Sequence, residues 1–149
     1  MAVKELVDIK KKELETKDFK AVAYNFLKAM EAFSDRREYR GSLYMYAQYL
    51  WADVLKEIGD YEEAIKSTET GIELCRRFES FGYAPWFYYI SGVCKKSLGS
   101  DKAEYMEHFN RAYHVAYAIG KKTTGKELKQ KMKQDNDIEV GLFGGSYEN

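Results

Sequence analysis

Apolar residues recur along most of this chain with the 3.6-residue period of an amphipathic α-helix. In YAQYLWADVLKEIG, one helical face carries Ala47, Trp51, Val54, Leu55 and Ile58. In DKAEYMEHFNRAYHVAYAIG, the same spacing gives Tyr105, Phe109, Ala112, Ala116 and Ile119. Strand-like alternation is nearly absent, apart from a weak signal in DIEVGLF near the end of the chain. The pattern predicts an all-α protein.

Three segments share one outline, which indicates internal repeats. Each opens with a polar turn and an aspartate, Asp18, Asp60 or Asp101, and continues as an amphipathic helix. The aspartates are 42 and 41 residues apart, and a further helical window precedes each of them, at about 3–16, 40–58 and 85–98. The sequence therefore predicts three helix pairs, each with a first helix A and a second helix B. Residues 1–135 form the predicted repeat domain, and residues 136–149 form a tail.

Helix-start signals place several of these elements. Acidic or hydroxyl residues with N-cap and N3 spacing, typical of a capping box, are Asp60 with Glu63, Asp101 with Glu104, and Thr124 with Glu127. The last pair predicts a C-terminal helix over about 125–134. Pro85 is the single proline, and it suits the first turn of the third A helix.

Gly71 falls inside the predicted B helix of the second pair, where glycine is about 1 kcal/mol less favourable than alanine. Ala64, Thr68, Gly71 and Cys75 follow one another at helical spacing and form a stripe of small side chains. Such a stripe lets a neighbouring helix approach closely, and the packing gained there offsets the poor helix propensity. A hinge or a ligand contact at Gly71 is the alternative interpretation.

Residues 45–76 resemble a tetratricopeptide repeat (TPR). The matching positions at the turn and along helix B are Gly59, Asp60, Tyr61 and Ala64, whereas Thr68 and Gly71 stand where an aromatic residue and an alanine are usual. The first segment matches at Asp18, Phe19, Phe26 and Ala29, and the third at Gly92, Leu98, Gly99, Phe109 and Ala112. The resemblance implies a right-handed α-solenoid of about three TPR-like pairs plus a C-terminal helix, with the A helices on its concave side.

The repeat period exceeds that of a standard TPR array, which has about 34 residues per repeat. Long repeats of this kind, and the phrases GIELCRRFES, SGVCKKSLGS and RAYHVAYAIGKK, resemble the C-terminal peptide-sensing domains of bacterial Rgg and RNPP regulators. Members of that group carry a DNA-binding helix-turn-helix domain before the array. The first repeat here begins almost at Met1, so we do not infer DNA binding from this resemblance.

The resemblance also implies which residues face the groove. They are Tyr46, Tyr49, Asp53 and Lys56 in the second repeat, Trp86, Tyr89, Val93 and Lys96 in the third, and more weakly Lys4, Val7 and Lys11 in the first. Helical spacing supports part of this, because Tyr46, Tyr49 and Asp53 lie opposite Ala47, Trp51 and Leu55. Aromatic anchors beside charges of both signs suit an extended peptide or protein segment. Packing between helices is the alternative role for these aromatics.

Composition and motifs exclude several other functions. The 24 Lys+Arg residues balance the 24 Asp+Glu residues, so no basic field favours nucleic acid. His108 and His114 lie about 240° apart around one helix and cannot share a metal. Cys75 and Cys94 fall in apolar helical patterns and are expected to be buried thiols. We therefore predict no enzyme activity, no catalytic residue, no metal and no cofactor.

No apolar run approaches a membrane span and the N-terminus is too charged for a signal peptide, so a cytoplasmic protein is expected. The predicted function is peptide or protein binding, as the ligand-sensing or regulatory domain of a bacterial regulatory system. The alternative is a constitutive TPR adaptor or scaffold in a larger complex. A homodimer is compatible with either function. The glycine-rich tail is expected to lie in its own groove, against a neighbouring chain or as an extension.

Overall fold

The structure is a computed structural model that describes residues 17–33 and 42–141. Every regular element in these ranges is an α-helix, as the hydrophobic periodicity predicts. The helices are α2 (Lys17–Phe33), α3 (Ser42–Glu57), α4 (Tyr61–Arg77), α5 (Ala84–Ser97), α6 (Lys102–Ala118) and α7 (Lys122–Asn136). The helix predicted over 3–16, with Lys4, Val7 and Lys11, lies outside the described residues.

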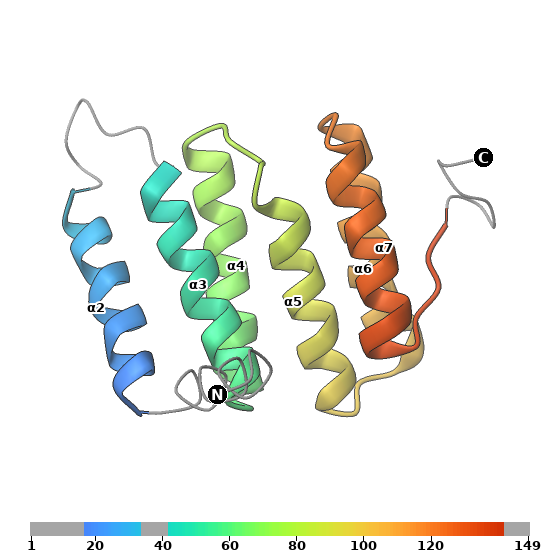
Figure 1. The fold of residues 1–149 in the computed structure, drawn as a ribbon, viewed down its shortest axis with the longest axis horizontal. Helices are drawn as coiled ribbons and strands as arrows, with labels where there is room; N and C mark the ends of the chain where they lie inside the picture. Colours follow the sequence, from blue (N-terminus) through green and yellow to red (C-terminus); the bar gives the residue numbers. More distant parts are fainter. Residues whose placement is uncertain (1–16, 34–41, 142–149) are drawn as a thin grey trace, which may run out of the picture.

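The helices stand side by side, and each packs against its neighbours in the sequence (Figure 1). In addition, α3 contacts α5 and α5 contacts α7, whereas no comparable contact joins α4 to α6 in the described part of the chain. Figure 1 shows α3 in front of α4 and α7 in front of α6. The odd-numbered helices therefore define one face of the array, and α4 and α6 lie toward the other.

Four of the helices end in the same hydrogen-bonded turn. A residue with positive φ donates its amide to the carbonyl three residues back, and the next residue donates to the carbonyl five residues back, as in a Schellman motif. The residues with positive φ are Gly59, Glu79, Gly99 and Gly120. The turns predicted at Gly59 and Gly99 are confirmed. Their even spacing along the chain explains why a helix pair repeats about every 41 residues.

The helix starts agree only in part with the capping-box prediction. Asp60 and Asp101 occupy the N-cap positions of α4 and α6, but neither side chain makes the capping hydrogen bond. The capping box predicted at Thr124 and Glu127 is wrong, because α7 begins at Lys122 and Thr124 lies inside its first turn. Pro85 lies in the first turn of α5, as predicted.

The stripe of small residues on α4 is buried, and Phe87 of α5 packs directly over it. A Cβ atom placed on Gly71 would lie 2.4 Å from the ring of Phe87, a distance that real Cβ atoms do not reach. A Cβ atom placed on Gly92 would lie 3.1 Å from the ring of Phe109, and one placed on Gly125 would lie 2.4 Å from the ring of Tyr117. The prediction that Gly71 allows close helix packing is confirmed.

The core is continuous with a short segment that follows α7. Ile138 and Val140 are buried in the same cluster as Leu128 and Met132 of α7 and residues of α5 and α6. The amide of Ile138 donates to the carbonyl of Met132 at 3.0 Å. Residues 137–141 therefore close one end of the array without forming a strand, so the weak strand signal in DIEVGLF is wrong for them.

Candidate functional site

Aromatic rings form a continuous row across α2, α3 and α5, which we call the aromatic ladder. Consecutive ring centroids are 5.4–6.3 Å apart, within the range of favourable aromatic contacts. In order, the ladder consists of Phe26, Tyr46, Tyr83, Tyr49, Trp86 and Tyr89. It therefore joins the four aromatics that the TPR resemblance placed on the groove into one row of contacting rings.

Tyr83 completes the ladder and was missed by the sequence analysis. It is the N-cap residue of α5 and stacks on Tyr49 with a centroid distance of 5.4 Å and an interplanar angle of 29°. It also contacts Tyr46 at 6.1 Å. Helical periodicity assigns no face to a residue in a turn, although the aromatic cluster FGYAPW around Pro85 was a usable signal.

The rings of the ladder differ in exposure. Tyr46 is 40% exposed, Tyr49 and Trp86 are half-buried, and Tyr89 is only 3% exposed. Burial raises the pKa of Tyr49 to about 12, with a further contribution from the charge of Asp53. Helical spacing placed Tyr49 opposite the core residues of α3, yet Tyr49 and Trp86 both pack against buried residues where α3 meets α5.

The charged residues predicted for the groove are bonded to the protein itself. Lys56 lies 3.0 Å from a carboxylate oxygen of Asp53 and 3.1 Å from one of Glu57. Burial alone would lower the pKa of Lys56, but these two carboxylates raise it above its ordinary value. The ammonium of Lys56 also lies 5.7 Å from the ring centroid of Tyr89. Lys56 is therefore a fixed positive charge at the end of the ladder.

A pocket of about 350 Å³ opens beside this charge. Its lining comes from α3, the start of α4, α5 and α7, and consists of Lys56, Glu57, Tyr61, Tyr89, Val93, Lys131, Asp135 and Asn136. The side-chain amide of Asn136 donates to the Tyr89 hydroxyl at 2.9 Å, and Lys96 donates to the backbone carbonyl of Asn136. Asn136 thus ties the end of α7 to α5 and forms one wall of the pocket.

The structure brings the predicted site residues together in two groups. Asp53, Lys56, Tyr89 and Lys96 surround the pocket or its wall, whereas Tyr46, Tyr49 and Trp86 lie in the ladder. The contact between Trp86 and Tyr89, at 6.2 Å, connects the groups. The site therefore combines an apolar aromatic row with a polar pocket at one end.

The described residues hold no group of three or more histidine, cysteine, aspartate or glutamate side chains suited to a metal ion. His108 lines a pocket between α4, α5 and α6, whereas His114 contacts the carbonyl of Gly141 at 3.0 Å. Cys75 and Cys94 are buried free thiols whose pKa values burial raises to about 11 and about 12. Protonated thiols of this kind are poor nucleophiles and poor metal ligands.

Among the described helices, none has the length and apolar character needed to cross a bilayer. No protein-family model, curated protein or solved structure matches this chain. The function proposed below therefore depends on the geometry and chemistry of the site and on the sequence resemblance described above.

Proposed function

We propose that this protein is a non-enzymatic module that binds an extended peptide or protein segment on the face of α3, α5 and α7. In this proposal the helix pairs form a right-handed, TPR-like superhelix, and the odd-numbered helices line its concave side. The contacts of α3 with α5 and of α5 with α7 support this geometry, because helices on the concave side of a curved array lie closer together than those on the convex side.

The aromatic ladder is the observation that carries the proposal. Tyrosine and tryptophan rings held against one another lose little conformational entropy on binding, and they offer both apolar area and polar edges. Tyr46, the second ring of the row, leaves 40% of its surface exposed, and the pocket beside Lys56 opens at the Tyr89 end. An extended peptide lying along the row would place apolar side chains on the rings and a polar group in the pocket.

The regulatory form of the proposal is a ligand-sensing domain in a bacterial system that passes peptide binding to a partner. Asn136 supports a link between binding and conformation, because it lines the pocket and also holds the end of α7 against α5. The second candidate is a constitutive adaptor, which the mixed charge of the pocket also suits. Mass spectrometry of material retained after native purification separates them. A short peptide favours the sensor, and a large stoichiometric partner favours the adaptor.

The test of the site is Tyr46→Ala, with Phe81→Ala as the matched control. Both rings are similarly exposed, 40% and 43%, but only Tyr46 belongs to the ladder. Tyr46→Ala should weaken binding of the retained ligand by about 1–3 kcal/mol, the usual range for an aromatic anchor, and leave the melting temperature nearly unchanged. Phe81→Ala should alter neither quantity. Equal affinities for both variants and the parent protein would exclude the ladder as the binding surface.

A further inference from the structure

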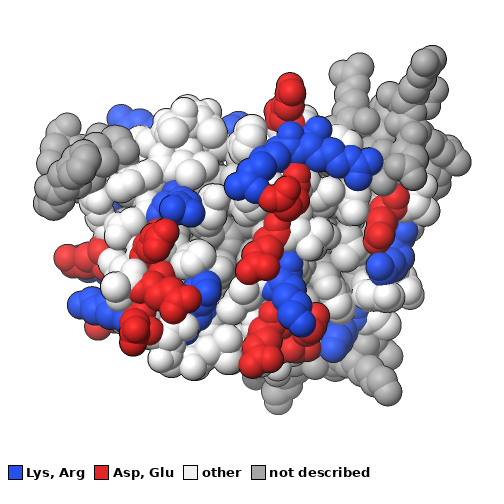
Figure 2. Space-filling view, turned by 180° about the vertical axis from the view of Figure 1, so that it is seen from behind, with Lys and Arg blue, Asp and Glu red and all other residues white. Residues whose placement is uncertain are grey.

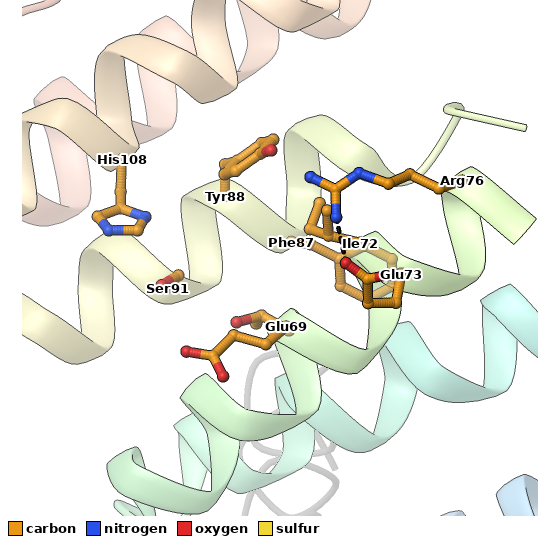
Figure 3. Close-up of a pocket in the computed structure, with 9 residues that line it drawn as sticks. Glu69, Ile72, Glu73, Arg76, Phe87, Tyr88, Ser91 and His108 are labelled. Atoms are coloured by element: carbon orange, nitrogen blue, oxygen red, sulfur yellow. Dashed lines mark hydrogen bonds and ion pairs between the residues drawn. The ribbon is translucent and has the colours of Figure 1, made fainter.

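A second pocket, of about 230 Å³, lies between α4, α5 and α6, away from the aromatic ladder. Figure 3 shows Glu69 and Ile72 entering it from α4, Tyr88 and Ser91 from α5, and His108 from α6. This volume is below the roughly 300–1,000 Å³ of typical small-molecule sites. The pocket therefore suits a single side chain or a very small ligand.

The interior of this pocket offers hydrogen-bond acceptors. The Thr68 hydroxyl donates to the carbonyl of Ile65 at 2.6 Å, so its oxygen can only accept a further bond. Ser91 adds a buried hydroxyl. The Nδ1 atom of His108 is buried and has no hydrogen-bond partner, which is an unfavourable state for a polar atom. Burial, with the charge of Lys95 as the next contribution, lowers the pKa of His108, so a neutral ring with an accepting nitrogen is favoured.

The rim of the pocket carries an uncompensated negative charge. Glu73 pairs with Arg76, as the dashed line in Figure 3 marks. Glu69 is exposed and has no ion-pair partner in the described part of the chain. Seen from behind, basic and acidic side chains form small neighbouring groups, and neither sign covers the whole face (Figure 2). This face therefore has no general preference for a ligand of either sign, whereas Glu69 provides a local negative charge at the pocket rim.

We propose that this pocket binds a primary alkylammonium group, from either a free amine or a lysine side chain of a partner. An ammonium carries three donors and no acceptor, which complements the hydroxyl oxygens of Thr68 and Ser91 and the neutral ring of His108 beside them. Its positive charge complements Glu69, and its alkyl chain can pack against Ile72 and Tyr88. The pocket is separate from the peptide site, so failure of this proposal leaves the proposed function unaffected.

The experiment is an NMR titration of the ¹⁵N-labelled full chain with n-butylamine and, separately, with Nα-acetyl-lysine N-methylamide. n-Butanol serves as the uncharged control ligand. Saturable shifts confined to amides near Thr68, Ser91 and His108 are expected with at least one ammonium compound. Saturation by the amine alone assigns the site to free amines, and saturation by the lysine derivative alone assigns it to a partner's side chain. Equal binding of n-butanol, or no saturation with either amine, would overturn the proposal.

A pair of charge-neutralising variants tests the role of Glu69. Glu69→Gln should weaken ammonium binding about tenfold, the effect of losing one charged hydrogen bond. Glu62→Gln removes the same charge from the same helix, two turns away and outside the pocket, and should leave binding unchanged. Both glutamates are exposed, so neither variant should disturb folding. Equal affinity in the two variants would remove Glu69 from the site.

Discussion

At the scale of single residues, the contact between a glycine and an aromatic ring recurs along the array. Gly71, Gly92 and Gly125 each lie beneath a ring of the neighbouring helix, and added Cβ atoms would be 2.4–3.1 Å from those rings. Glycine lowers helix propensity in each case, so the packing must contribute more than the propensity loses. The sequence revealed this for Gly71 through its stripe of small neighbours. The stripe did not indicate which ring would pack on Gly71, because Phe87 reaches this position only through the tertiary packing of α5 on α4.

Gly71→Leu should therefore destabilise the protein, although leucine is the better helix former. The expected loss is about 3 kcal/mol, the upper end of the usual range for overpacked cores, because the ring of Phe87 is itself fully buried. Urea unfolding measures it. Gly82→Ala is the control, since an added Cβ there meets nothing within 4 Å, and it should change stability by less than about 0.5 kcal/mol. A more stable Gly71→Leu variant would contradict the packing described.

The two thiols predict how stability depends on pH. Burial raises the pKa of Cys75 from 9.0 to about 11 and that of Cys94 from 9.0 to about 12. Above pH 9 the unfolded chain releases these protons while the native state keeps them. The free energy of unfolding should therefore be highest below pH 9 and fall as the pH rises through the native-state pKa of Cys75, about 11.

Urea unfolding at several pH values checks this for the parent protein and for Cys75→Ala. The variant has one titrating thiol fewer and retains all other groups, so its stability should decline less steeply over the alkaline range. Identical slopes in the two proteins would show that Cys75 ionises equally in the native and unfolded states.

At the scale of elements, turn chemistry explains which helix boundaries were predictable. Gly59 and Gly99 mark their turns in the sequence because a left-handed residue is usually glycine. The turn at Glu79 has the same hydrogen bonds but no such marker. The capping-box spacing at Thr124 was misleading, since Gly120 and Lys121 close α6 and α7 begins at once. Local motifs therefore located the turns at Gly59 and Gly99, missed the turn at Glu79 and misplaced the helix start that follows Gly120.

Glu79→Gly should stabilise the protein by about 0.5–1 kcal/mol. Glu79 has φ of 50°, a conformation that costs a residue with a Cβ atom about 1–2 kcal/mol, and the greater freedom of unfolded glycine offsets part of the gain. Gly99→Ala is the reciprocal change at an equivalent turn. Its φ is 82° and an added Cβ meets nothing within 4 Å, so it should lose about 1 kcal/mol through the backbone alone.

Thermal and urea unfolding of both variants measure these opposite effects. A destabilised Glu79→Gly variant would mean that the glutamate side chain contributes more than its backbone conformation costs.

At the scale of the whole molecule, some residues of the candidate site could be predicted from the sequence and others could not. The resemblance to TPR arrays placed Tyr46, Tyr49, Trp86 and Tyr89 on one face, and contacts between their rings join α3 to α5, because these two helices lie side by side. Helical spacing indicates which side of a helix a residue lies on, but not how deeply neighbouring helices bury it. It therefore did not predict that Tyr89 is buried. Asn136 was missed for a different reason. It reaches Tyr89 across 47 positions of the chain, and no local pattern indicates such a contact.

The two tryptophans allow the faces of the molecule to be monitored separately. Trp86 lies in the ladder between Tyr49 and Tyr89, whereas Trp51 contacts Tyr24 of α2 at 5.3 Å. In Trp51→Phe, the remaining Trp86 should change its fluorescence emission when the natively retained ligand binds, because a peptide on the ladder alters the exposure of that ring. In Trp86→Phe, the remaining Trp51 should not respond.

The same two variants should give no response to n-butylamine, because neither tryptophan lines the pocket between α4, α5 and α6. Both substitutions keep an aromatic ring of reduced size, so melting temperatures identify any variant whose packing has changed. If Trp51 responds to the retained ligand and Trp86 does not, the ligand binds near α2 and the aromatic ladder is a packing feature between α3 and α5.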